Sequence, residues 1–216
     1  MMLRSWVIAS VLLLAPIAGA QPASAAPAAA GAKTIVFLGD SLSAGLGVEH
    51  SEAFPALIAD KIHAANLPFQ VENAGLSGDT TAGGLRRVDW LLQRKIDVLV
   101  LELGGNDGLR GLPVANMKAN LEAIVAKVKA KNPEAKIVIA GMQIPPNVGA
   151  KYATEFRQTF ADVANENNAL LIPFLLENVG GHAELNQDDM IHPTAAGHRV
   201  VAETVWRALE PILRQG

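Results

Sequence analysis

Short apolar segments alternate along the chain with longer segments whose apolar residues recur every three or four positions. The short segments are rich in Val and Ile, which is typical of parallel strands that are buried on both faces. We expect strands at residues 34–38, 69–72, 98–102, 137–140 and 170–172. We expect helices at residues 53–65, 81–93, 113–131, 151–167 and 193–213.

The helix expected at residues 113–131 shows the amphipathic pattern most clearly, and Pro113 and Pro133 bracket it. Its apolar stripe consists of Met117, Leu121, Ile124, Val125 and Val128. Five strands that alternate with five helices predict an α/β protein with three α/β/α layers around a five-stranded, mostly parallel sheet. Functional sites in such sheets lie at the carboxyl ends of the strands.

Composition narrows the class of protein further. The chain has 216 residues, of which 50% are hydrophobic, so it can bury the core of one domain, which we place at residues 33–216. The formal net charge is -3, no basic stripe is present and only 5% of the residues are aromatic, so we expect no nucleic-acid partner. Nucleotide binding is excluded on other grounds: residues 45–47 (GLG) lack the third glycine of the dinucleotide fingerprint, and no phosphate loop with Gly-Lys-Ser/Thr is present. The absence of cysteine excludes disulfides and thiolate catalysis. We expect a monomer.

The amino-terminal residues have the features of a secretory signal. Arg4 precedes an apolar run at residues 7–17, and the small-residue triplets at residues 18–20 and 23–25 are both candidate cleavage sites. The run is shorter than the roughly 20 residues of a membrane-spanning helix, although an uncleaved anchor remains an alternative. We therefore expect a signal peptide at residues 1–20, with cleavage as late as residue 26, and an Ala/Pro-rich leader at residues 21–32.

A serine and a histidine far apart in the chain suggest the chemistry. Ser41 follows the first expected strand in a tight turn, and Asp189 stands three residues before His192 in a loop near the end. A serine hydroxyl becomes a strong nucleophile when an imidazole takes its proton and a carboxylate orients that imidazole. The spacing favours Asp189 as the orienting carboxylate, and Asp188 is the competitor. Taken alone, Ser41 would be an ordinary turn residue.

Two further loops leave the same edge of the expected sheet. Gly75 lies after the second strand, where a glycine allows a backbone N–H to approach a carbonyl oxygen. Asn106 lies after the third strand in a glycine-rich loop, where its amide can donate to the same oxygen. The simpler interpretations are a strand-to-helix connection and an Asn-Asp-Gly turn.

Together these segments resemble the four sequence blocks of the GDSL, or SGNH, hydrolases. The blocks are residues 39–43 (GDSLS), 73–78 (NAGLSG), 105–107 (GND) and 189–193 (DMIHP). Residues 104–111 and 142–147 are similar to the thioesterase I, lysophospholipase L1 and arylesterase branch. The resemblance implies a flavodoxin-like SGNH hydrolase fold.

The resemblance also implies roles for individual residues. Ser41 would be the nucleophile, His192 the general base and Asp189 its orienting partner. The backbone N–H groups of Ser41 and Gly75 and the amide of Asn106 would form the oxyanion hole. The implied substrates are carboxylic esters and acyl thioesters, such as aryl esters, acyl-CoA and lysophospholipids, with no cofactor or metal. With the signal, the resemblance implies a bacterial periplasmic or secreted enzyme.

Apolar residues in the loops after the third and fourth strands are candidates for an acyl-binding site. They are Leu109, Leu112, Pro113, Ile144, Pro145 and Tyr152. Simple loop packing is the alternative explanation for their apolar character.

Two other functions remain open. A carbohydrate O-deacetylase would use the same serine and histidine but would accept only acetyl groups. A metal-binding, non-catalytic envelope protein would instead use the acidic and histidine-rich loop near the end of the chain. The side chains that would bind the metal are His182, Glu184, Asp188, Asp189 and His192.

Overall fold

A computed structural model describes residues 31–144 and 148–215 of the chain. The expected signal peptide, the leader up to residue 30 and Pro145 lie outside the described residues. Five strands form one sheet: β1 (Lys33–Gly39), β2 (Phe69–Asn73), β3 (Val98–Glu102), β4 (Lys136–Ala140) and β5 (Leu170–Ile172). Their order is β2-β1-β3-β4-β5, and every neighbouring pair is parallel.

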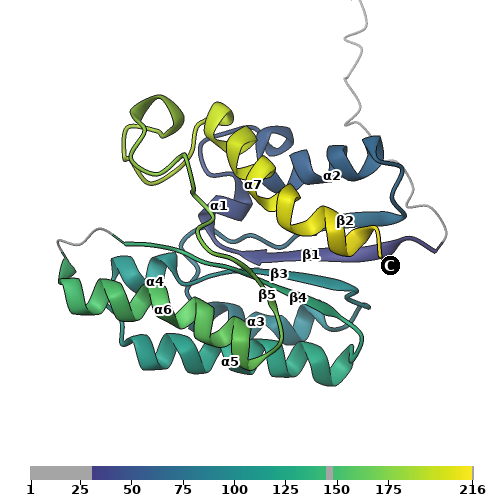
Figure 1. Cartoon of the computed structure of the whole chain (residues 1–216), viewed down its shortest axis with the longest axis horizontal. Coiled ribbons are helices and arrows are strands. Elements are labelled where there is room, and N and C mark those ends of the chain that lie inside the picture. The colour runs from purple at the N-terminus through teal and green to yellow at the C-terminus, as the bar shows by residue number, and fades with distance from the viewer. Residues whose placement is uncertain (1–30, 145–147, 216) are drawn as a thin grey trace, which may run out of the picture.

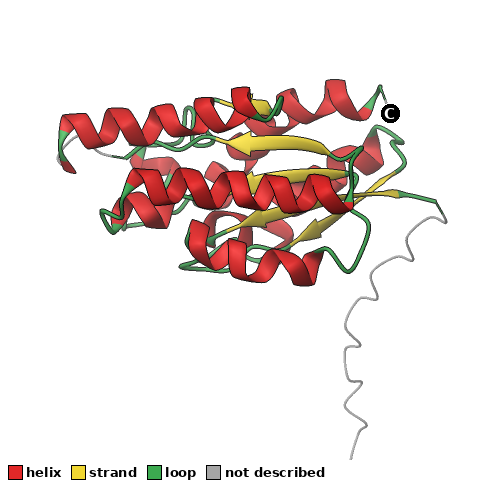
Figure 2. Cartoon of the chain, turned by 90° about the horizontal axis from the view of Figure 1, so that it is seen from below, coloured by secondary structure: helices red, strands yellow, loops and turns green. Residues whose placement is uncertain are grey.

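Helices cover both faces of this sheet, as Figures 1 and 2 show. They are α1 (Ser41–Ala44), α2 (Phe54–Ala64), α3 (Thr81–Leu91), α4 (Gly105–Leu109), α5 (Val114–Lys131), α6 (Ala150–Glu166) and α7 (Ala195–Leu213). Helices α2 and α7 lie on one face, and α3, α5 and α6 lie on the other (Figure 1). The predicted three-layer α/β/α fold is confirmed.

The central position of β1 determines where a site can form. From β1 the chain first adds β2 on one side and then β3 on the other, so the strand order reverses between β1 and β3. The segments that follow two such strands run away from each other, which leaves a crevice outside the carboxyl ends of the strands. Ligands of parallel sheets bind in this crevice. Ser41 follows β1 and Asn106 follows β3, so both candidates lie at the reversal.

The buried side chains follow the predicted pattern. All five residues of β3 are buried, because the strand lies between β1 and β4 and is covered on both faces. The stripe on α5 is buried as expected, at Met117, Leu121, Ile124, Val125 and Val128. On the opposite face, Phe37 of β1 meets Phe54 of α2 edge to face, with ring centroids 5.5 Å apart.

Two short helices occur where we expected irregular loops. Helix α1 begins at Ser41 because the Asp40 side chain accepts a hydrogen bond from the Leu42 N–H at 3.0 Å and caps its first turn. Helix α4 begins after Gly104, whose φ of 125° lies in a region that favours glycine. Both helices start at a carboxyl end of a central strand, and each carries a candidate site residue in its first turn.

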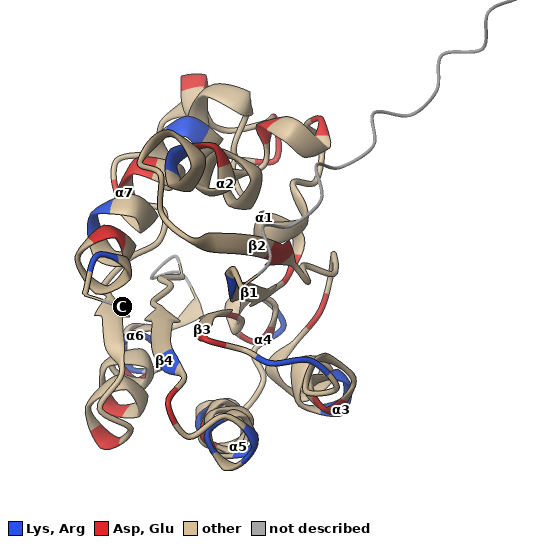
Figure 3. Ribbon diagram, turned by 90° about the vertical axis from the view of Figure 1, so that its right-hand side faces the viewer, with Lys and Arg blue, Asp and Glu red and all other residues tan. Residues whose placement is uncertain are grey.

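Charged residues of both signs are distributed over the outer surfaces of the helices (Figure 3). Within residues 31–144 and 148–215, no helix has both the length and the apolar character to span a membrane.

Candidate active site

The position of Ser41 follows from the end of β1. The side chain is the first of α1 and only 8% of the residue is exposed. Its Oγ lies 2.8 Å from Nε2 of His192, although the two residues are 151 positions apart in the chain. This is hydrogen-bond distance, so the imidazole is placed to accept the hydroxyl proton.

The loop that carries His192 holds a carboxylate on the other side of the ring. Asp189 Oδ2 lies 2.5 Å from His192 Nδ1, and Asp189 Oδ1 accepts the N–H groups of Ile191 and His192 at 2.9 and 3.0 Å. Partial burial raises the pKa of Asp189, but the hydrogen bonds from His192 and Ile191 outweigh that effect and lower it to about 2. The aspartate is therefore ionised wherever the imidazole can act as a base.

The geometry of this loop also depends on its backbone. Met190 has a φ of 58°, which is unusual for a residue with a side chain and turns the chain sharply between Asp189 and His192. Asp188 is exposed and forms no hydrogen bond with any described residue, so Asp189 alone contacts the ring.

Gln187 ties this loop to the one that follows α1. Its backbone N–H donates to the His192 carbonyl at 2.7 Å. Its side-chain Nε2 donates to the carbonyl oxygens of Leu46 and Pro193, at 2.7 and 3.0 Å. Because these bonds join the segments of Ser41 and His192, Gln187 fixes their separation, a role that the sequence blocks did not suggest.

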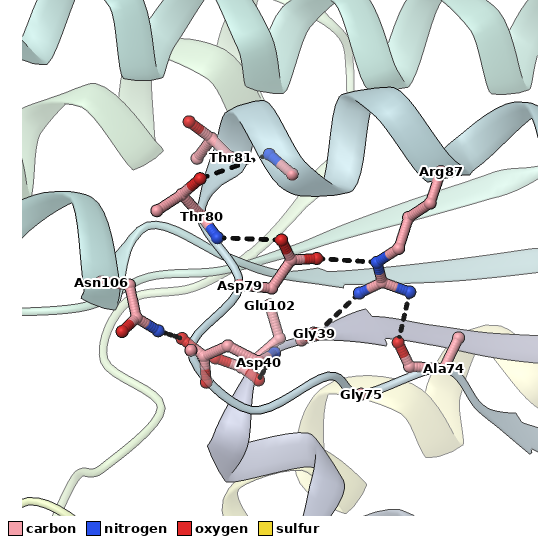
Figure 4. A network of polar contacts seen from close by, with 12 residues as sticks. Gly39, Asp40, Ala74, Gly75, Asp79, Thr80, Thr81, Arg87, Glu102 and Asn106 are labelled. Atoms are coloured by element: carbon pink, nitrogen blue, oxygen red, sulfur yellow. Dashed lines mark hydrogen bonds and ion pairs between the residues drawn. The ribbon is translucent and has the colours of Figure 1, made fainter.

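Asn106 is oriented by the buried carboxylate of Asp40, the residue that precedes Ser41. Its Nδ2 donates to Asp40 Oδ2 (Figure 4), and the two atoms are 3.0 Å apart. An amide nitrogen carries two hydrogens, so the second remains available to an oxyanion. Burial raises the pKa of Asp40 to about 6, and hydrogen bonds from Leu42 and Asn106 oppose that rise.

Gly75 does not present a free backbone donor. Its N–H donates to Asn73 Oδ1 at 2.9 Å, and Asn73 Nδ2 donates to the Ser43 carbonyl at 2.7 Å. A Cβ at Gly75 would lie 2.3 Å from the Ala44 nitrogen, so glycine allows this loop to pack directly on α1. Three residues later, Gly78 is exposed with a φ of 79°, and its N–H has no partner within the described residues.

An arginine holds the same loop against β1. Arg87 of α3 donates to the carbonyl oxygens of Ala74 and Gly39, at 2.7 and 2.9 Å, and its Nε forms an ion pair with Asp79 at 2.7 Å (Figure 4). The Asp79 side chain is 7% exposed. These contacts tie the loop after β2 to α3 and to β1, and removal of the arginine would leave the nearly buried Asp79 charge without its cationic partner.

The residues expected at an acyl site come from two loops that meet. The Tyr152 hydroxyl donates to the Leu112 carbonyl at 2.7 Å, and Ile144 packs beside Gly108. Leu109 and Leu112 are 51% and 36% exposed, and Pro113 is the N-cap residue immediately before α5. Three surface hollows of 420–490 Å³ lie elsewhere, and none is lined by Ser41, Asp189 or His192.

The acidic and histidine-rich loop divides into separate pairs. His182 Nδ1 lies 3.5 Å from Glu184 Oε1, while His192 contacts Asp189. Over residues 31–144 and 148–215, no group of three or more His, Cys, Asp or Glu side chains converges to hold a metal ion.

A nearly buried serine, an imidazole and a carboxylate are thus joined in series at the carboxyl edge of a parallel sheet, beside an amide that can stabilise an oxyanion. This arrangement defines a serine hydrolase.

The chain belongs to the GDSL-like Lipase/Acylhydrolase family, which matches residues 37–200 and confirms the resemblance seen in the sequence. It is similar to esterase TesA of Pseudomonas aeruginosa, with 41% identity over 85% of this chain and 91% of that protein. Thioesterase 1/protease 1/lysophospholipase L1 of Escherichia coli is 38% identical, over 86% of this chain and 87% of that protein.

Solved structures agree with this assignment. The crystal structure of TesA superposes with a TM-score of 0.80 at 40% identity, covering 83% of this chain and 99% of the other. The psychrotrophic esterase EstA from Pseudoalteromonas sp. superposes with a TM-score of 0.79 at 36% identity, covering 84% of this chain and 99% of the other.

Proposed function

We propose that this chain is an esterase and thioesterase that cleaves acyl esters and acyl thioesters through an acyl-enzyme on Ser41. The hydrogen-bond distance between Ser41 Oγ and His192 Nε2, 2.8 Å, is the observation that carries this proposal. The names of the relatives support the substrate class, since they are esterase TesA and thioesterase 1/protease 1/lysophospholipase L1.

The proposed reaction has two halves. His192 Nε2 takes the Ser41 proton while Oγ attacks the carbonyl carbon, and Asp189 stabilises the imidazolium that forms. The negative carbonyl oxygen is stabilised by the Ser41 N–H, the Asn106 amide and a backbone donor from the loop after β2. His192 then protonates the leaving oxygen or sulfur, and water repeats the steps on the acyl-enzyme.

Two glycines of the loop after β2 are candidates for the third donor of the oxyanion hole. Gly75 was expected from the sequence, but its N–H must leave Asn73 Oδ1 before it can reach an oxyanion. Gly78 requires no such break, and its free N–H supports it as the alternative donor of the same loop.

The test is hydrolysis of p-nitrophenyl esters from acetyl to palmitoyl, together with an acyl-CoA, by the wild type and Ser41→Ala. Ser51→Ala, at an exposed serine next to α2, is the matched control. Activity that is lost only in Ser41→Ala and extends to medium or long acyl chains supports the proposal. Activity confined to acetyl esters would instead favour the O-deacetylase, and equal rates in all three proteins would refute Ser41 as the nucleophile.

We also propose that the enzyme is exported to the bacterial periplasm or secreted. The proposal rests on the charged, apolar and small-residue pattern of residues 1–25. Expression of the full chain in a bacterium, followed by cell fractionation and mass determination of the mature amino terminus, tests it. Recovery of the uncleaved chain in the cytoplasm would contradict it.

A further inference from the structure

A buried glutamate lies directly behind the nucleophile. Glu102 ends β3 and is 0% exposed. Its Oε2 accepts the backbone N–H groups of Asp40 and Ser43, both at 3.2 Å, and the Ser43 hydroxyl at 2.7 Å. These donors flank Ser41 on both sides, so one oxygen atom links the end of β3 to the turn that carries the nucleophile.

The sheet provides space for this contact at one position. Gly39 of β1 is the register partner of Glu102 of β3. A Cβ at Gly39 would lie 2.1 Å from Ser43 Oγ and 2.5 Å from Glu102 Oε2. Position 39 therefore requires a glycine, because the side chains of Glu102 and Ser43 come too close to leave space for a Cβ atom.

The other oxygen of Glu102 indicates its charge. Oε1 is buried and has no hydrogen-bond partner among the described residues. An ionised carboxylate would leave this oxygen charged and unpaired beside the Asp40 carboxylate, which costs more than a neutral acid in the same place. Burial, and then the charge of Asp40, raise the pKa of Glu102 well above its usual range, against the hydrogen bonds from Ser43 and Asp40.

Other charged groups act on the pair formed by Glu102 and Asp40. His192 and Asp79 also act on Asp40, the first favouring and the second opposing its ionised form. Arg87 bonds to the Gly39 carbonyl and to Asp79 and makes no contact with Glu102. No cation contacts Glu102 itself within the described part of the chain, so Asp40 carries the negative charge of the pair.

We propose that Glu102 is a positioning residue for the nucleophile, acting as a neutral carboxylic acid whose Oε2 holds the Asp40–Ser43 turn and thereby aims Ser41 Oγ at His192. This inference rests on the proposed role of Ser41. A small displacement of a reacting group costs up to about 100-fold in rate, so the effect belongs in kcat and leaves substrate affinity largely unchanged.

The experiment compares Glu102→Gln with Glu102→Leu on a p-nitrophenyl ester. Glutamine keeps an acceptor oxygen and no charge, so we expect kcat within about threefold of the wild type and an unchanged pH profile of kcat/KM. Leucine has similar size but no acceptor, so we expect kcat to fall about 10- to 100-fold with little change in KM. If the leucine variant does not fold, Ser43→Ala removes the 2.7 Å donor alone, and we expect a smaller fall in kcat.

Infrared spectroscopy tests the neutral state without using activity. The difference spectrum of the wild type minus Glu102→Gln at pH 7 should contain the C=O band of a protonated carboxyl group. A carboxylate band in its place, or a glutamine variant as impaired as the leucine variant, would overturn the neutral acceptor. Wild-type kcat in a folded leucine variant would overturn the positioning role. Parallel measurement of Ser41→Ala separates these failures from a failure of the proposed nucleophile.

Discussion

The substitution Asp40→Asn should make the protein more stable and less active. Asp40 is 2% exposed, and burial is the main reason for its raised pKa. A carboxyl group whose pKa rises on folding disfavours the folded state when it is ionised, so its cost is absent at low pH and complete once the pH exceeds the folded pKa. Asparagine has nearly the same shape and does not ionise.

The magnitude follows from the size of the pKa change. A rise from 3.8 to about 6 corresponds to about 3 kcal/mol at pH 8, because each tenfold change in proton affinity is worth about 1.4 kcal/mol. At pH 5 about half of this cost remains, because the folded carboxyl is then mostly protonated. Asparagine cannot accept hydrogen bonds from both Leu42 and Asn106, which costs about 1 kcal/mol at every pH.

The free energy of unfolding should therefore be about 2 kcal/mol higher in Asp40→Asn than in the wild type at pH 8, and about 1.5 kcal/mol of that gain should be lost at pH 5. Urea denaturation at both pH values measures it. Asp60→Asn, at an exposed position on α2, is the control and should show no such dependence. We expect kcat to fall roughly tenfold, because Asn106 loses its charged acceptor. A difference between the two proteins that does not vary with pH, or that grows as the pH falls, would refute the reasoning.

Other substitutions test separate parts of the site. Asn106→Ala should lower kcat by about 10²- to 10³-fold with little change in KM, measured on a p-nitrophenyl ester; an unchanged kcat would exclude the amide from the oxyanion hole. Gln187→Glu places a carboxylate against two carbonyl oxygens, so kcat should fall about tenfold. Gln187→Met introduces no charge there, so its kcat should fall less. Arg87→Met should lower the free energy of unfolding by about 3 kcal/mol, because Asp79 is left buried and unpaired; a loss below 1 kcal/mol in urea denaturation would contradict this. The wild type should be more stable than Asp189→Asn above about pH 4, and this difference should disappear as the pH falls to about 2. The reason is that folding lowers the pKa of the Asp189 carboxyl group.

The strands and long helices were predictable because residues that become buried in them are apolar and recur at regular spacings in the sequence. Each parallel strand is covered on both faces, so apolar runs such as residues 98–101 mark the strands within one or two residues. The short helices α1 and α4 were not predictable from periodicity, since four or five residues hold too little of a helical repeat. They depend on a cap at Asp40 and a positive φ at Gly104.

The positions of Ser41, Asp189 and His192 could be proposed from the sequence because each stands in a short local motif. The environments of Glu102 and Gln187 could not, because their contacts join segments that are about 60 and 140 residues away. A charged residue at the end of the apolar run 98–101 was the only signal for Glu102. The hydrogen bond from Gly75 to Asn73 is also a property of the folded loop, so the sequence alone could not show that the Gly75 N–H already has an acceptor.

The separation of 151 residues between Ser41 and His192 has a consequence for folding kinetics. The first strand of the fold carries the nucleophile, and the base arrives with the loop before α7, after every strand has been added. Long-range contacts of this kind close late, because the chain entropy of a large loop must be overcome before they form. Recovery of ester hydrolysis after dilution from denaturant therefore reports the final docking step, and it should lag behind the recovery of helical circular dichroism.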